Sequence, residues 1–167
     1  METFDALSSD GWAGWAYSNH DVIRHKSRWD LTETRQRLYA ALLMALKGMA
    51  CLYQGEELGL TEADVAFEDL QDPYGKRFWP KFKGRDGCRT PMVWDREQKN
   101  CGFSDGEPWL PVSTGHQRLS AAAEDRDPNS TLNFYRQIIG LRKSLPALQK
   151  GSFTPLMVEE DYLCLLY

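Results

Sequence analysis

The sequence predicts an α/β fold in which parallel strands alternate with helices, as in a slice of a larger parallel sheet or barrel. Two strand ends support this fold class. An apolar run over residues 11–17 stops abruptly at the polar residues 18–21, and a second apolar run over 49–53 stops at the polar residues 54–57. Buried strands of parallel sheets deliver polar side chains in this way at their carboxyl ends. Residues 1–10, before the first run, are expected to form the tail of a helix or a loop.

The segment between the two runs is expected to hold a polar loop over 18–30 and then a helix over 31–47. Asp30 and Glu33 have the spacing of a capping box at the start of this helix. Gly48 is a natural stop at its end, because glycine readily adopts the backbone conformation that follows a helix. The apolar face of the helix is predicted to consist of Leu38, Ala41, Leu42, Ala45 and Leu46.

The second half of the chain begins with a long segment from 58 to about 128 that is rich in proline and glycine and shows little periodicity. A loop of this length inside a compact domain is uncommon and is usually functional. A second amphipathic helix is predicted over 130–144, with Ser130 as its N-cap. Residues 153–167 then predict a strand, a turn at 159–161 and a second strand. The apolar face of the second helix is predicted to consist of Leu132, Tyr135, Ile138, Ile139 and Leu145.

Composition excludes several classes of protein. The chain has 167 residues, of which 42% are hydrophobic and 26% charged, which predicts a folded protein and not a disordered one. The net charge of -4, without long runs of one sign, gives no electrostatic support for binding nucleic acid. No apolar run reaches the roughly 18 residues that a membrane span requires. The four cysteines lack the spacing of a zinc site, so we expect no metal and no cofactor.

The chain starts at Met1 without the basic and apolar regions of a signal peptide, so a cytoplasmic location is expected. Two strands cannot form a sheet with a covered core, and both predicted helices would leave an apolar face exposed. A larger barrel of which this chain is one part would cover these surfaces, so the native N-terminus is expected to lie further upstream.

Two carboxylates are the first candidates for chemistry. Asp21 and Glu56 follow the two successive strands, and two carboxyl groups across one cleft suit glycoside hydrolysis, one as proton donor and one as nucleophile or base. His20 could donate a hydrogen bond to a substrate hydroxyl, and Arg24 or Arg85 could pair with a carboxylate and keep it ionised. The alternative is that Asp21 caps the next segment and Glu56 is a solvated loop residue.

Three motifs in order resemble those of the α-amylase superfamily, specifically of its α-glucosidase and oligo-α-glucosidase branch. The sequence Ser-Asn-His-Asp at 18–21, followed by Val-Ile-Arg and by Arg28-Trp29, is similar to the seventh-strand motif of that branch. Tyr-Gln-Gly-Glu-Glu-Leu-Gly at 53–59 resembles its eighth-strand motif. Gly-Arg-Asp-Gly-Cys-Arg-Thr-Pro-Met-Val-Trp-Asp at 84–95 resembles the segment after that strand. The resemblance covers nearly the whole chain.

The resemblance implies a domain organisation. Residues 1–149 would be the C-terminal portion of a catalytic (β/α)8 TIM barrel, from strand 7 to helix 8. Residues 150–167 would be the start of an all-β C-terminal domain, which is cut short in this sequence.

The resemblance also implies a role for each candidate residue. Asp21 matches the third acidic residue of these retaining enzymes, which hydrogen-bonds sugar hydroxyls and stabilises the oxocarbenium-like transition state. It would be neither nucleophile nor proton donor, in contrast to the role that the residues alone suggest. His20 matches a histidine that binds hydroxyls of the same sugar, and Arg85 an arginine that reaches the glucose at the non-reducing end. Glu56 matches a loop near the acceptor side, where a purely structural role remains the alternative.

Two further residues of the motifs, Arg24 and Asp86, are expected to orient the site through pairs with other residues and not to contact sugar.

The implied function is hydrolysis of α-glucosidic bonds in short oligosaccharides by a retaining mechanism, as part of a larger enzyme. The substrate would be an α-linked gluco-oligosaccharide, without cofactor or protein partner. One alternative is a transglucosylase or a sucrose or maltose isomerase of the same superfamily. The other is a catalytically inactive truncated fragment, because the family motifs that carry the nucleophilic Asp and the acid/base Glu, after the fourth and fifth strands, are absent from this sequence.

Overall fold

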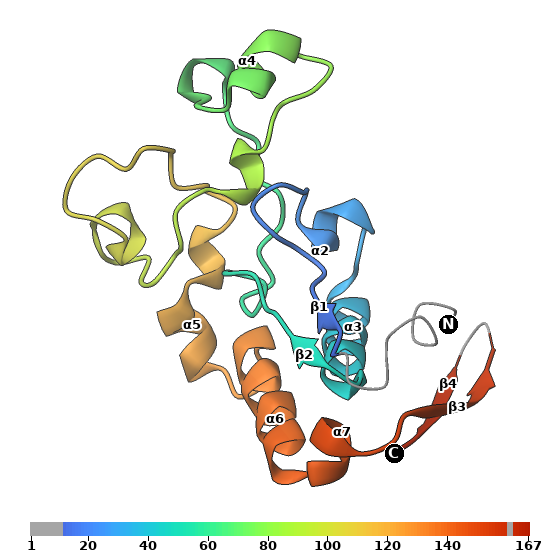
Figure 1. The fold of residues 1–167 in the computed structure, drawn as a ribbon. Coiled ribbons are helices and arrows are strands. Elements are labelled where there is room, and N and C mark those ends of the chain that lie inside the picture. Colours follow the sequence, from blue (N-terminus) through green and yellow to red (C-terminus); the bar gives the residue numbers. More distant parts are fainter. Residues whose placement is uncertain (1–11, 160–161) are drawn as a thin grey trace.

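The computed structural model describes residues 12–159 and 162–167 (Figure 1). The expectation for residues 1–10 therefore lies outside the described residues, as does most of the predicted turn at 159–161. The order of the larger elements confirms the α/β character of the chain, with two parallel strands first, helices around them and a hairpin at the end (Figure 1).

The two predicted parallel strands are present but short. β1 (Gly14–Trp15) pairs in parallel with β2 (Met49–Ala50), with Gly14 opposite Met49 and Trp15 opposite Ala50. Hydrogen bonds from Met49 N to the Ala13 carbonyl and from Cys51 N to the Trp15 carbonyl, both 2.8 Å, flank this ladder. The predicted spans 11–17 and 49–53 were too long, because each strand has one partner within the described chain and pairing stops where that partner ends.

The helix between the strands is α3 (Glu33–Ala45). Its N-cap is Thr32, whose side chain accepts a hydrogen bond from Arg35 N, so the predicted capping box at Asp30 is wrong. A short helix, α2 (His25–Arg28), occupies part of the predicted loop, and Asp30 leaves it with a left-handed backbone (φ 47°). The predicted stop, Gly48, has φ 119° and follows the end of the helix.

The second predicted helix is confirmed as α6 (Thr131–Ser144), and Ser130 caps it by accepting a hydrogen bond of 3.1 Å from Asn133 N. α6 packs against α3, which buries Tyr135 completely. A further short helix, α7 (Pro146–Lys150), was not predicted. Arg142 of α6 donates to backbone carbonyls at the end of α3 and beyond it, those of Met44, Leu46 and Gly48.

The long segment that was predicted as a loop is a folded lobe of short helices around two small apolar clusters. Leu58, Leu60 and Val93 belong to the first cluster; Leu70 and Leu110 belong to the second. Short helices can pack this tightly without a periodic sequence, which explains why periodicity gave no signal. The helical elements are η1 (Phe67–Asp69), α4 (Pro73–Phe78), η2 (Asp86–Cys88), η3 (Lys99–Gly102), η4 (Gln117–Leu119) and α5 (Ala121–Arg126).

The chain ends in the predicted hairpin. β3 (Thr154–Val158) pairs antiparallel with β4 (Leu163–Leu166), with an irregularity between Pro155 and Met157. Among the helices of the described residues, none combines the length and the apolar character that crossing a membrane would need.

Candidate functional site

The site is built at the carboxyl end of β1, where the polar residues 18–21 leave the strand. The backbone N–H of Asp21 donates to Oδ1 of Asn19 over 2.8 Å, which fixes a tight turn and holds the Asp21 side chain outward. The side chains of His20 and Asp21 are 70% and 52% exposed, and Nε2 of His20 lies 3.3 Å from Oδ2 of Asp21. Both predicted groups are therefore neighbours that solvent can reach.

Two arginines from the third motif hold the Asp21 carboxylate from the other side. Nη1 of Arg85 and Nη2 of Arg89 each donate to Oδ1 of Asp21 over 3.1 Å. Nε of Arg89 also donates to the backbone carbonyl of His20 over 2.7 Å. The structure thus brings His20, Asp21 and Arg85 together as predicted, and it adds Arg89. Both arginines bind the same oxygen, which leaves Oδ2 on the side of His20.

Asp72, which sequence reasoning missed, fixes the guanidinium of Arg85. Nε and Nη2 of Arg85 donate to its two carboxylate oxygens over 2.8 and 3.0 Å, and the Arg85 N–H adds a third bond of 2.9 Å. The Asp72 side chain is fully buried. Hydrogen bonds from Arg85 hold the pKa of Asp72 well below its usual range, and the same pair raises the pKa of Arg85. A bidentate pair of this kind fixes the orientation of the guanidinium.

The buried Asp86 orients the site through other residues, as expected. Its Oδ2 accepts the backbone N–H groups of Gln71 and Asp72 over 2.6 and 2.8 Å, and this anchors the segment that presents the Asp72 carboxylate to Arg85. Asp86 therefore positions Asp72, and through Asp72 it positions Arg85.

Arg24 connects the three motifs. Its buried guanidinium donates to the carbonyls of Gln54 and Cys88 over 2.7 and 3.1 Å and lies over the ring of Tyr53, with Cζ 5.0 Å from the ring centroid. Burial lowers its pKa. One cation thus joins the segment after β1, the segment after β2 and the helical turn η2, in agreement with the expected orienting role.

Glu56 does not belong to the cluster around Asp21, which we call the Asp21 cluster and which consists of His20, Asp21, Asp72, Arg85 and Arg89. Only 2% of the residue is exposed, because a backbone turn after β2 directs it inward, toward His25 and Tyr135. Its Oε1 lies 3.6 Å from Nδ1 of His25 and 3.4 Å from the Tyr135 hydroxyl, and Oε2 accepts the Tyr53 N–H over 3.3 Å. In this position Glu56 has no surface on which to meet a sugar, so we leave it out of the proposed site.

Burial also decides the charge state of this inner cluster. Desolvation raises the pKa of Glu56 to about 7 and lowers the pKa of His25 to about 4. Between these values both groups are neutral, so their contact is not an ion pair there despite the short distance. The buried Ser18 hydroxyl, 2.9 Å from Nδ1 of His25, completes the cluster and connects it to the segment that carries Asp21.

We expect the free energy of unfolding of Glu56→Gln to increase relative to that of the wild type as pH rises. The carboxyl group has its ordinary pKa of 4.5 in the unfolded chain and about 7 in the folded one. As pH rises between these values the folded state retains a proton that the unfolded state loses, so wild-type stability falls. Glutamine cannot titrate, and its relative gain should reach about 3 kcal/mol.

Denaturant unfolding at a series of pH values checks this prediction. Burial lowers the pKa of His25 and of His116, a buried residue immediately before η4, to about 4. This adds a slope of opposite sign between about pH 4 and 6.5, and because burial is its main cause in both proteins, it cancels in the difference. Parallel stability profiles for the two proteins would show that Glu56 titrates normally in the folded state.

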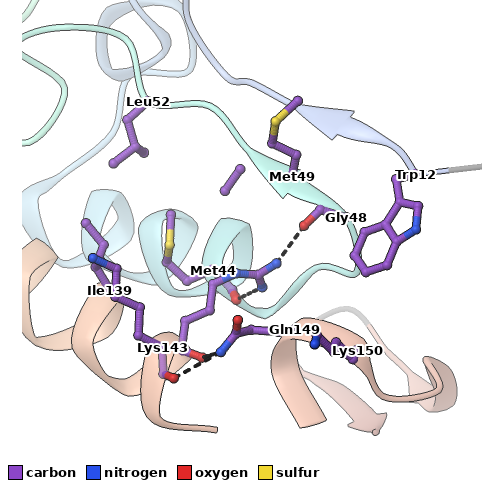
Figure 2. A pocket seen from close by; sticks show the side chains of 11 residues that line it. Trp12, Met44, Gly48, Met49, Leu52, Ile139, Lys143, Gln149 and Lys150 are labelled. Atoms are coloured by element: carbon purple, nitrogen blue, oxygen red, sulfur yellow. Dashed lines mark hydrogen bonds between the residues drawn. The ribbon is translucent and has the colours of Figure 1, made fainter. Parts of the chain in front are cut away.

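A pocket at the opposite end of the strands is not the site. Figure 2 shows it between Trp12, Met49 at the start of β2, Met44 of α3, Ile139 of α6 and Lys150 of α7. Reactive groups of parallel α/β folds lie at the carboxyl ends of strands, whereas this pocket lies at the amino end of β2. Its polar bonds are those by which Arg142 and Gln149 join the ends of helices (Figure 2).

Comparison with known proteins decides the family. The sequence profile described as "Alpha amylase, catalytic domain" matches residues 1–151. The chain belongs to the alpha-amylase family. Its α/β content is accordingly that of the TIM-barrel fold of the alpha-amylase catalytic domain.

Individual members of the alpha-amylase family agree with this placement. A "Probable alpha-glucosidase" of Rhizobium meliloti is 52% identical over 155 residues, which is 90% of this chain and 28% of that protein. The crystal structure of the alpha-glucosyl transfer enzyme XgtA superposes with a TM-score of 0.90 at 47% identity, over 98% of this chain and 31% of that one. The crystal structure of isomaltulose synthase from Erwinia rhapontici NX5 superposes with a TM-score of 0.74 at 30% identity, over 88% of this chain and 30% of that one. The chain thus spans less than a third of the length of each.

Proposed function

We propose that the intact protein containing this chain hydrolyses α-glucosidic bonds in short oligosaccharides with retention of configuration. In this proposal the chain contributes the part of the site that binds sugar and stabilises the transition state. The observation that carries the proposal is the half-exposed carboxylate of Asp21 at the carboxyl end of β1, held by two arginines and flanked by His20. The similarity to a probable alpha-glucosidase supports it.

The geometry suits this part of the reaction. Glycoside hydrolysis passes through an oxocarbenium-like transition state, and a fixed carboxylate stabilises its positive charge. The arginines occupy Oδ1 of Asp21, so Oδ2 would accept a sugar hydroxyl, and the exposed His20 would donate to or accept from a neighbouring one. Arg85 uses three of its five N–H donors on Asp72 and Asp21, which leaves two for sugar.

The nucleophile and the proton donor would come from outside this cluster. Retaining hydrolysis needs a pair of free carboxyl groups about 5 Å apart. The other carboxylate bonded to Arg85, that of Asp72, is buried and has both oxygens bound by this arginine, so it could serve as neither. We propose that the pair lies in the part of the intact protein that corresponds to the segments of its relatives not spanned by this chain.

The domain organisation belongs to the same proposal. Residues 1–149 would form the barrel portion from strand 7 to helix 8, and 150–167 the start of the C-terminal β domain. The parallel pairing of β1 with β2 and the change to an antiparallel hairpin after α7 support this division.

A transglucosylase or a sucrose or maltose isomerase is the second candidate. The similarity to an alpha-glucosyl transfer enzyme and to isomaltulose synthase favours it, because the structures of these proteins superpose on most of the chain. A catalytically inactive fragment is the third candidate, supported by the single available carboxylate of the cluster.

Product analysis separates the candidates. The intact protein is incubated with maltose, isomaltose and sucrose, and the products are resolved by chromatography. Hydrolysis predicts free glucose in proportion to the bonds broken. New, longer saccharides would indicate glucosyl transfer, and conversion of a disaccharide to an isomer without free glucose would indicate an isomerase. If none of the three sugars is consumed, the enzymatic proposal fails.

A further inference from the structure

Helix α4, at the top of Figure 1, carries two aromatic side chains that are both exposed to solvent. Tyr74 and Phe78 are 57% and 48% exposed, and their rings are parallel within 8°, with centroids 6.5 Å apart. They lie four residues apart and so share one side of the helix. We call this pair the aromatic shelf. Aromatic rings held parallel at the surface offer a flat apolar face to a ligand.

The fold fixes the shelf in its exposed position. A Cβ atom on Gly75 would lie 2.7 Å from the carbonyl oxygen of Lys83, so α4 rests directly on that backbone. At the end of the helix, Trp79 contacts Phe67, with ring centroids 5.6 Å apart, and packs against the buried cluster that contains Leu70. Because α4 is anchored at these points, the shelf cannot turn toward the protein interior.

The aromatic shelf lies next to the Asp21 cluster, and Arg85 contacts both. Cζ of Arg85 lies 5.5 Å from the centroid of the Tyr74 ring, and Nη1 of the same guanidinium binds Asp21. Asp72 accepts both the Tyr74 N–H, over 3.1 Å, and the side chain of Arg85. One arginine and one carboxylate therefore lock the aromatic shelf next to the proposed sugar site, and a single guanidinium separates the two.

We propose that the aromatic shelf is a second sugar-binding subsite, which stacks the pyranose ring next to the glucose unit held at Asp21. This inference rests on the proposed function and extends it to the second unit of the oligosaccharide. A pyranose ring has a flat face of C–H groups that packs on aromatic rings, while its hydroxyls need polar partners. The Tyr74 hydroxyl has no hydrogen-bond partner within residues 12–159 and 162–167, and the guanidinium of Arg85, over the Tyr74 ring, keeps two N–H donors that are not used on Asp72 or Asp21.

The test compares substrates with and without a second sugar ring. Wild type, Tyr74→Ala, Tyr74→Phe and Phe78→Ala of the intact protein are assayed on α-glucosyl fluoride and on the disaccharide among maltose, isomaltose and sucrose that is consumed fastest. We expect Tyr74→Ala to lower kcat/KM for the disaccharide about five- to tenfold and to leave that for the fluoride within about twofold. Tyr74→Phe keeps the ring and should retain most activity. Tyr162→Ala, an exposed aromatic of the hairpin, is the matched control.

Three other results of these assays would overturn either the shelf or the proposed function. Equal losses on both substrates would show that Tyr74 acts through Arg85 and does not contact the second sugar, which overturns the inference. Full disaccharide activity in Tyr74→Ala and in Phe78→Ala would overturn it too, while the proposed function stands. If the wild type consumes neither substrate, the proposed function fails, and binding of maltotriose by calorimetry decides the shelf. Weaker binding by Tyr74→Ala than by the control Tyr162→Ala supports it, and equal binding by all variants refutes it.

Discussion

Replacing Asp21 by asparagine in the intact protein is expected to lower kcat about 10³-fold on an α-glucoside. The carboxylate is the one exposed negative charge of the cluster, and two guanidinium groups fix its position before substrate arrives. Asparagine has almost the same shape but no charge to oppose the positive charge of the transition state. The loss should therefore fall mainly on kcat, with a smaller change in KM.

Steady-state kinetics with a nitrophenyl α-glucoside measure the effect of Asp21→Asn. The control is Asp125→Asn, which removes another exposed carboxylate, one paired with Arg136, far from the cluster in sequence. It should leave kcat unchanged. A kcat for Asp21→Asn within tenfold of the wild-type value would remove Asp21 from the catalytic residues.

Replacing Arg24 by methionine is expected to lower the free energy of unfolding by about 2–6 kcal/mol. The methionine would fill much of the same space, but the carbonyls of Gln54 and Cys88 would lose their donor in a buried position. An unsatisfied buried carbonyl costs about 1–3 kcal/mol. The variant would also loosen the connection between the three segments that form the site, so activity should fall with stability.

Denaturant unfolding of Arg24→Met measures this loss. Arg35→Met serves as the control, because Arg35 lies exposed on α3 and its side chain forms no hydrogen bond within the part of the chain that the structure describes. The control should stay within about 0.5 kcal/mol of the wild type. A similar small change for Arg24→Met would mean that the three segments hold together without it.

Local periodicity explains which parts of the fold were predictable. α6 and the final hairpin follow from apolar spacing and from the cap at Ser130, which are properties of neighbouring residues. α3 forms where a helix was predicted, but its predicted apolar face is wrong, because Leu38 is 66% exposed. Its buried side is set by tertiary contacts with α6 and with the Glu56 carbonyl, and it consists of Gln36, Ala40, Leu43 and Met44. The cap of α3 was misplaced because Asp30 and Thr32 are both good capping residues, and α2 uses Asp30 to end its own turn. The lobe between Leu58 and α5 holds together through tertiary contacts of short helices, which leave no period in the sequence.

The site shows the same division. His20 and Asp21 are adjacent in sequence. The resemblance of the third motif to a known segment was enough to predict Arg85 as a residue of the same site, and the structure places it against Asp21. Asp72 was missed because no spacing rule pairs it with an arginine 13 residues later. The burial of Glu56 depends on Tyr135, which is 79 residues away in the chain, so its sequence position after a strand could not reveal that it turns inward.

Release of nitrophenol from its α-glucoside by the chain of 167 residues on its own shows directly whether these residues hold a complete catalytic set. We expect no release above background, because the described cluster offers one free carboxylate where retaining hydrolysis needs an additional pair. Clear turnover that Asp21→Asn abolishes would contradict this expectation. The 167 residues would then hold a complete catalytic set, and Asp21 would have to act as one of its reacting carboxylates.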